Sequence, residues 1–286
     1  EMEQMAMDII DTYGTDTVVD IPALRAANPR LNLAYEIAEQ NHFMHWELEF
    51  ADLFAERGGF DLVIGNPPWV KIQWNEQGIL SDCNPLFAVK KLTATQTAHY
   101  REAALTSNHT RVMYFSEYKS MSGKQDFLNA TQNYPLLKGQ QTNLYKCFLP
   151  QAWQYGSEYG ASAFIHLDGI FDDPRADVLR AVLYSKLKYH FKFQNEKLLF
   201  DIMHTRSYSA NVYANSQKCI NFDCIFDLYD PITIDECYEG AISDTVPGIK
   251  DGKGNWNTHG HPKRIVHVTK KELLLFANVF DNSDEW

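Results

Sequence analysis

The sequence lacks several features that would place a protein in a particular class. No apolar run approaches the roughly 18 residues of a membrane span, and residues 1–11 lack the basic region and apolar core of a signal peptide. The five cysteines form no C-x-x-C pair, and their spacing with His259 and His261 matches no common zinc module. We therefore expect a soluble cytoplasmic protein with reduced thiols, no metal site and no membrane partner.

Basic residues are scarce relative to acidic ones. The chain has 26 Lys and Arg against 37 Asp and Glu, for a net charge of −11. Affinity for nucleic acid depends largely on basic side chains that meet phosphates, so this balance argues against a general polyanion binder. A local basic strip beside a cleft, or phosphate contacts from another domain, would still allow DNA binding.

Short apolar runs alternate with helical patterns along much of the chain. Residues 60–64 (FDLVI), between Gly58-Gly59 and Gly65, have the composition of a strand that is buried on both faces of a sheet. Further strands are expected at 161–167, 189–193 and 209–213. Between the strands, one helix is expected to follow Thr142 and to end at Gly156 and Gly160, and another is expected at 176–187. This order predicts an open, twisted α/β sheet.

The remaining segments are less regular. Residues 1–40 show helical spacing interrupted by Pro22 and Pro29, and residues 71–142 are expected to form a long, irregular surface excursion with one helix near 87–104. Thr142 is expected to cap the next helix, and Thr269 with Glu272 to cap a helix over 269–279. Between 214 and 269 the pattern loosens.

The segment after the first strand carries the clearest chemistry. In open α/β sheets, ligands bind at the carboxyl ends of the strands, and Asn66-Pro67-Pro68-Trp69 lies at such an end. The two prolines stiffen the backbone and remove two N–H donors, so their carbonyls can face a ligand. Asn66 adds a side-chain oxygen, and Trp69 adds an aromatic face. Together they suit an amino group on a flat ring, with two acceptors and one stacking surface.

This loop resembles the Asn-Pro-Pro-aromatic motif of methyltransferases that alkylate amino groups with S-adenosylmethionine. Residues 60–69 look like the adenine-specific (N6) DNA enzymes. The segment before the loop, His45-Trp46-Glu47-Leu48-Glu49-Phe50, resembles the corresponding segment of the large single-chain restriction–modification and phage-defence methylases. The resemblance covers about residues 42–213. It implies that the Asn66 side chain and the Pro67 carbonyl hold the adenine amino group, and that Trp69 stacks on a base flipped out of the duplex.

The resemblance also assigns roles to residues outside the loop. Glu49 fits the acidic position that contacts the cofactor best, and Asp52 second; a solvated or capping carboxylate is the alternative. Phe200 resembles the residue that packs on the other face of the flipped base, with Tyr208 as its competitor and a plain core role as the alternative. His204 and Arg206 could touch phosphate, or be exposed loop charges.

One departure from the family concerns the cofactor. The Gly-rich cofactor loop of these enzymes precedes this region, and nothing like it occurs before residue 58. We therefore expect a piece of a larger enzyme, which by itself binds cofactor poorly and methylates little. The implied fold is the second half of a Rossmann-like class I methyltransferase sheet, with these expected parts: a helical segment 1–41, a catalytic region 42–213 with the insertion 71–142, and a C-terminal extension 214–286 that could begin a DNA-recognition region.

The expected function is methylation of adenine in double-stranded DNA, in restriction–modification or phage defence. The expected partners are DNA and the remainder of the same polypeptide. Two alternatives stay open: methylation of RNA or of a protein glutamine, and a non-catalytic domain that keeps the methylase shape. The recognition sequence, a fused nuclease and the oligomeric state are not determined by these residues.

Overall fold

The computed structural model describes residues 20–90, 92–140, 143–240, 246, 248 and 250–281. Contacts divide the chain into two compact units, Glu1–Asp52 and Leu53–Trp286. The first part of the expected N-terminal helix and the expected cap Thr142 lie outside the described residues. None of the described helices combines the length and the apolar character needed to cross a membrane.

The first unit is helical over its described part. It contains α2 (Ile21–Ala27), α3 (Pro29–Asn41) and α4 (Trp46–Glu49), and α5 (Ala51–Arg57) starts at its end. The Asn28 side chain accepts hydrogen bonds from the first turn of α3. Pro22 and Pro29, expected to interrupt a helix, instead stand in the first turns of α2 and α3, where a missing N–H costs no helical hydrogen bond.

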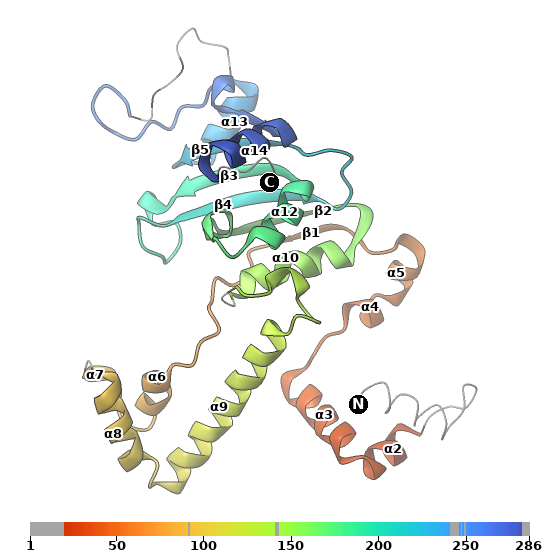
Figure 1. The fold of residues 1–286 in the computed structure, drawn as a ribbon, viewed down its shortest axis with the longest axis vertical. Helices are drawn as coiled ribbons and strands as arrows, with labels where there is room; N and C mark the ends of the chain where they lie inside the picture. Colours follow the sequence, from red (N-terminus) through yellow and green to blue (C-terminus); the bar gives the residue numbers. More distant parts are fainter. Residues whose placement is uncertain are drawn as a thin grey trace. The chain divides into compact units, whose positions relative to one another are not determined.

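The second unit contains one six-stranded mixed sheet, in the order β1-β2-β4-β3-β5-β6 (Figure 1). Its strands are β1 (Phe60–Gly65), β2 (Gly156–Leu167), β3 (Leu187–Gln194), β4 (Ser207–Ala214), β5 (Asn221–Leu228) and β6 (Val266–Thr269). The pairs β1–β2 and β3–β5 are parallel, and the other three pairs are antiparallel. The mixed α/β class and the first four strands agree with the sequence-based prediction. The strands β5 and β6 were not predicted.

The strand β1 corrects one expectation. It was expected to be buried on both faces, but it stands at the edge of the sheet in the described part of the chain, with Leu62 60% and Ile64 75% exposed. Its start is held close to the end of helix α10 (Leu144–Tyr155). A Cβ on Gly59 would lie 2.5 Å from the Tyr155 carbonyl oxygen, and the φ of Gly59 is +143°, so glycine is required there.

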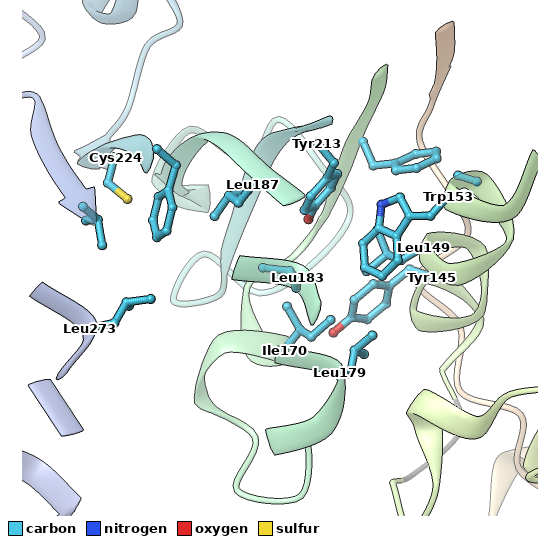
Figure 2. Close-up of a cluster of buried hydrophobic side chains, with 14 residues drawn as sticks. Tyr145, Leu149, Trp153, Ile170, Leu179, Leu183, Leu187, Tyr213, Cys224 and Leu273 are labelled. Carbon is cyan, nitrogen blue, oxygen red and sulfur yellow. The ribbon is translucent and has the colours of Figure 1, made fainter. Parts of the chain in front are cut away.

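Helices cover one face of the sheet. α10 (Leu144–Tyr155), α11 (Gly169–Asp172), α12 (Asp177–Lys186) and α14 (Lys270–Phe276) all contribute to the main buried cluster. In Figure 2, Tyr145, Leu149 and Trp153 of α10 lie opposite Ile170, Leu179 and Leu183. The other face carries a smaller cluster around Phe193, Tyr208 and Ile225, to which Cys237 of α13 (Ile232–Glu239) belongs. Both faces of β2 and β4 are thus packed.

The segment 71–142 is not the irregular excursion that was expected. It contains α6 (Glu76–Ser81), α7 (Leu86–Val89), α8 (Ala94–Ala104), α9 (Asn108–Asn129) and the 3-10 turn η1 (Pro135–Leu137). Leu80, Phe87 and Tyr114 form a small core of their own, and Thr93 caps α8 through a capping box with Gln96. The expectation failed because α6, α7 and α9 each contribute only one of these three residues, so no single helix shows a strong apolar pattern.

The C-terminal part ends as expected. Thr269 and Glu272 form the predicted capping box at the start of α14, which continues as the π-helical turn η4 (Ala277–Asp281). The remaining 3-10 turns are η2 (Asn195–Lys197) and η3 (Pro262–Arg264). Because β5 and β6 pair with the same sheet, part of the segment 214–286 completes it. Whether this segment begins a DNA-recognition region stays a prediction.

Candidate active site

The loop that follows β1 lies at the sheet edge where β1 and β2 both end. These strands are parallel, and Gly65 pairs with Phe164 in the register. In the loop itself, Asn66 and Pro68 are exposed and Pro67 is buried. The Asn66 amide makes no hydrogen bond to any of the described residues, so its oxygen is available to a ligand. The role of this loop in binding an amino group stays a prediction.

Trp69 is fixed against the neighbouring strand. Its indole Nε1 donates a hydrogen bond to the backbone oxygen of Ile165 in β2, at 3.2 Å. The ring is only half-buried and belongs to the edges of both core clusters. This hydrogen bond joins residues 96 positions apart in the sequence and fixes the orientation of the indole.

The three residues predicted to bind the base are brought together. The ring centroids of Trp69 and Phe200 lie 4.7 Å apart, those of Trp69 and Tyr208 6.0 Å, and those of Phe200 and Tyr208 4.7 Å. We call Trp69, Phe200 and Tyr208 the aromatic site. Tyr208 is buried and stacks on Phe193 with parallel rings, and burial raises its pKa, so its hydroxyl stays neutral at ordinary pH.

The aromatic site is closed in this conformation. A base that stacks between Trp69 and Phe200 would make one stacking contact with each ring. Since each contact separates the ring planes by about 3.5 Å, the two rings would have to lie on the order of 7 Å apart. The observed centroid separation is 4.7 Å. A base can therefore enter between these two rings only if Phe200 moves away from Trp69.

Asn195 holds the segment that carries Phe200, and the sequence analysis missed it. Its side chain is 1% exposed; Nδ2 donates to the backbone oxygens of Phe200 (3.0 Å) and Ile202 (2.8 Å), while Oδ1 accepts from the Phe200 N–H (3.2 Å). The backbone of Phe200 is thus fixed on both sides. The available signal was an asparagine directly after a strand, where its amide commonly bonds to nearby backbone.

A buried polar network lies on the opposite face of the same strands. His166 Nδ1 lies 2.9 Å from the Leu167 oxygen, which can only accept, so Nδ1 carries the hydrogen. Nε2 is then the acceptor for the Tyr213 hydroxyl (2.9 Å) and Asn211 Nδ2 (3.0 Å). Complete burial lowers the pKa of His166 to about 4. Asn211 Oδ1 in turn contacts His190 Nδ1 at 2.7 Å.

The network ends at Asp168, directly after β2. Asp168 is 3% exposed, and its Oδ2 lies 2.8 Å from Lys192 Nζ, while Oδ1 lies 3.6 Å from His190 Nε2. Burial disfavours the charge of Lys192, but the hydrogen bond and the charge of Asp168 outweigh it and raise the pKa of that lysine. Burial lowers the pKa of His190, against the pull of Asp168. The network stiffens the strand ends that carry the aromatic site on their other face.

The two expected cofactor residues lie in the first unit. Glu49 is at the end of α4 and Asp52 in the first turn of α5, and both are exposed. Neither carboxylate pairs with a basic side chain among the described residues, so both are free to accept hydrogen bonds from a ligand. Their chemistry fits hydroxyl or amino groups of a nucleoside.

The helical insertion begins and ends beside the loop. Lys71 and Asn143 form an isolated antiparallel bridge, and the Leu144 N–H donates to the Val70 oxygen at 3.0 Å. Gln125 of α9 donates to the Ile72 oxygen at 2.9 Å. The four helices α6 to α9 are therefore attached to the chain within three residues of Trp69.

Comparison with protein families gives a match over the segment that contains the loop after β1. The model of the Eco57I restriction-modification methylase matches residues 12–117, which include Asn66 to Trp69. The match covers less than half of the chain. It confirms the resemblance of this part of the chain at the level of a restriction–modification methylase. The comparison with curated proteins gives no match.

Several solved structures are similar to the chain at low identity. They include the type IIG restriction endonuclease BpuSI (13% identity, TM-score 0.34, 55% of this chain and 18% of that chain) and the ATP-dependent type ISP restriction-modification enzyme LlaBIII bound to DNA (14%, 0.34, 68% and 12%). A DrdV–DNA complex gives 14% identity, a TM-score of 0.34, and 68% and 18% coverage. The chain spans less than a fifth of the length of each.

Proposed function

We propose that this chain forms the catalytic-loop part of an enzyme that transfers a methyl group from S-adenosylmethionine to the exocyclic amino group of adenine in double-stranded DNA. The process it serves would be restriction–modification or phage defence. The observation that carries the proposal is the position of Asn66-Pro67-Pro68-Trp69 at the end of β1, with Trp69 packed against Phe200 and Tyr208.

The proposed chemistry depends on positioning. The Asn66 side-chain oxygen and the Pro67 carbonyl accept the two hydrogens of the amino group, which draws its lone pair out of conjugation with the ring and directs it at the incoming methyl. Pro68 keeps this backbone rigid and adds no competing donor. Trp69 stacks on the ring, and Phe200 and Tyr208 enclose it. Held in this geometry, the amine nitrogen would take the methyl in line as the bond between methyl and sulfur breaks, and one proton of the amine would be lost to solvent. No covalent enzyme intermediate is required.

The cofactor role rests on fewer residues. When bound, the cofactor supplies an activated methyl group. Glu49 and Asp52 are exposed carboxylates without a basic partner among the described residues, which suits them to accept hydrogen bonds from its hydroxyl or amino groups. We propose that the main cofactor loop is provided by an upstream part of the same polypeptide. Residues 1–286 alone are then expected to bind cofactor poorly and methylate little.

The exposed edge of the sheet supports the proposal that an upstream part of the polypeptide packs on this chain. Leu62 and Ile64 of β1 are apolar and largely exposed, and an uncovered apolar strand at a sheet edge exposes both its side chains and its backbone hydrogen-bonding groups. Packing by the upstream part of the polypeptide would cover both. A purified larger protein that leaves this strand accessible to hydrogen exchange would contradict the proposed packing.

The test uses the full-length protein with labelled cofactor. Duplex DNA, RNA and protein are offered separately, and transfer confined to RNA or protein would refute DNA as the substrate. Asn66→Ala should lower kcat on the order of 100-fold or more, because a positioned polar group at the reacting atom is lost. Asn221→Ala, a change at an exposed asparagine of β5, is the matched control. Unchanged turnover in Asn66→Ala would favour a non-catalytic domain.

A further inference from the structure

The segment between β3 and β4 carries an unusual group of exposed apolar side chains. Leu198 is 64% exposed, Leu199 55% and Met203 60%. We call these three residues the apolar lip. Scattered exposed apolar residues need no explanation, but several within one twelve-residue connection point to a contact surface.

The connection is held in one conformation. The Asn195 N–H donates to the Arg206 oxygen at 3.1 Å, which closes the segment at its base, and the Asn195 side chain binds the backbone on both sides of Phe200. Leu198 has a φ of +50°, in the left-handed region, and its N–H donates to the Asn195 oxygen at 2.9 Å. A leucine held in this region is strained, and such strain is typically found at functional positions.

The apolar lip borders the aromatic site. Phe200 follows Leu199 directly; its ring packs inward on Trp69 and Tyr208, whereas the Leu198 and Leu199 side chains remain exposed. Because Phe200 must move before a base can enter between the rings, a ligand of the aromatic site has to pass this connection. A ligand that reaches the aromatic site therefore lies beside Leu199, the residue that precedes Phe200.

The side chains of the lip suit a contact with stacked base pairs. Leucine and methionine side chains offer no hydrogen bonds and suit the flat apolar faces of bases. At the base of the connection, Arg206 is exposed and forms no ion pair with the described residues, so it is available to a phosphate. Of the two carboxylates of the connection, Glu196 lies 3.4 Å from His204, and Asp201 is exposed.

On the basis of the proposed function, we propose that the apolar lip inserts against the base pairs beside the extruded adenine and occupies the gap that this base leaves in the duplex. Extruding a base breaks its stacking on both neighbours, and apolar side chains inserted between base steps can replace part of that contact. Leu198 and Leu199 provide the wedge. Asn195 keeps them at a fixed distance from Phe200.

The experiment compares binding of two kinds of duplex by the full-length protein. The target site is first mapped from labelled methyl groups in genomic DNA, and oligonucleotide duplexes then carry 2-aminopurine at the target, either correctly paired or mispaired. The Leu198→Ala/Leu199→Ala variant should bind the paired duplex on the order of tenfold more weakly and extrude less 2-aminopurine. The mispaired duplex should restore binding, because an unpaired base costs less to extrude. Leu275→Ala, at a leucine of α14 that is 58% exposed, is the matched control.

Each outcome of this experiment either supports or overturns the proposed wedge. Loss on the paired duplex with rescue by the mispair, and no change in Leu275→Ala, would support the wedge. Equal behaviour of variant and wild type would overturn it while leaving the proposed methylation intact. Equal loss on both duplexes together with a lower melting temperature would show that the lip packs against another part of the polypeptide, and would also overturn it. If the wild-type protein methylates no DNA, the proposed function fails, and the wedge with it.

Discussion

Replacing Asn195 with alanine is expected to uncouple Phe200 from the aromatic site while the sheet stays folded. The change removes three hydrogen bonds, to the Phe200 N–H and to the oxygens of Phe200 and Ile202. Each such bond contributes about 1 kcal/mol net, so the closed conformation of the connection loses roughly 3 kcal/mol. That corresponds to more than a hundredfold change in the ratio of closed to open connection.

The assay measures kcat/KM of the full-length protein on duplex DNA, 2-aminopurine fluorescence at the target, and the melting temperature. We expect Asn195→Ala to lower kcat/KM by about tenfold to a hundredfold, because the backbone of Phe200 is then no longer held where its ring can pack on a base that has entered. The matched control is Asn215→Ala, which removes hydrogen bonds of similar length to the Trp153 and Ser157 oxygens at the other end of β4. The control should lower the melting temperature without changing base extrusion. The reasoning would be refuted if both variants lost activity in proportion to their loss of stability.

Two further predictions concern stability. The pKa of His166 is about 4 in the folded protein and about 6.5 in an unfolded chain, so only the unfolded state gains a proton between these values. The contribution of His166 to the free energy of unfolding is therefore fully present above pH 6.5, and it falls by on the order of 3 kcal/mol as the pH drops towards 4. Urea unfolding at pH 7 and pH 5 should show a weaker pH dependence in His166→Gln than in wild type. Gly59→Ala should lower the unfolding free energy by several kcal/mol, since its Cβ would lie 2.5 Å from the Tyr155 oxygen at a φ of +143°; a melting temperature within 1 °C or so of wild type would contradict this.

The proline-containing loop after β1 could be predicted because its signals are local. The run Phe60 to Gly65 is short and apolar with glycines at both ends, and the two prolines after Asn66 end any regular structure. The capping box of Thr269 and Glu272 is local in the same sense. These features depend on backbone preferences within a few residues, which the sequence displays directly.

The exposure of β1 could not be predicted in the same way. Composition shows that Leu62 and Ile64 are apolar, but not which neighbours a strand has. The helices of the segment 71–142 were missed for a related reason: Leu80, Phe87 and Tyr114 form their core from three separate elements. When each helix contributes only one residue to a shared core, the apolar pattern along any single helix is weak.

The sequence alone determined that a strand ends in a rigid loop with an amide, two carbonyls and an indole, because those properties belong to Asn66, the prolines and Trp69 themselves. Only the tertiary structure decided what meets that loop. Three sets of contacts join residues from separate strands and connections. They are the hydrogen bond of the indole to Ile165, the packing of Trp69 on Phe200 and Tyr208, and the hydrogen bonds of the Asn195 side chain to the backbone around Phe200. Such contacts depend on strand order and register, which are set by the packing of the whole sheet.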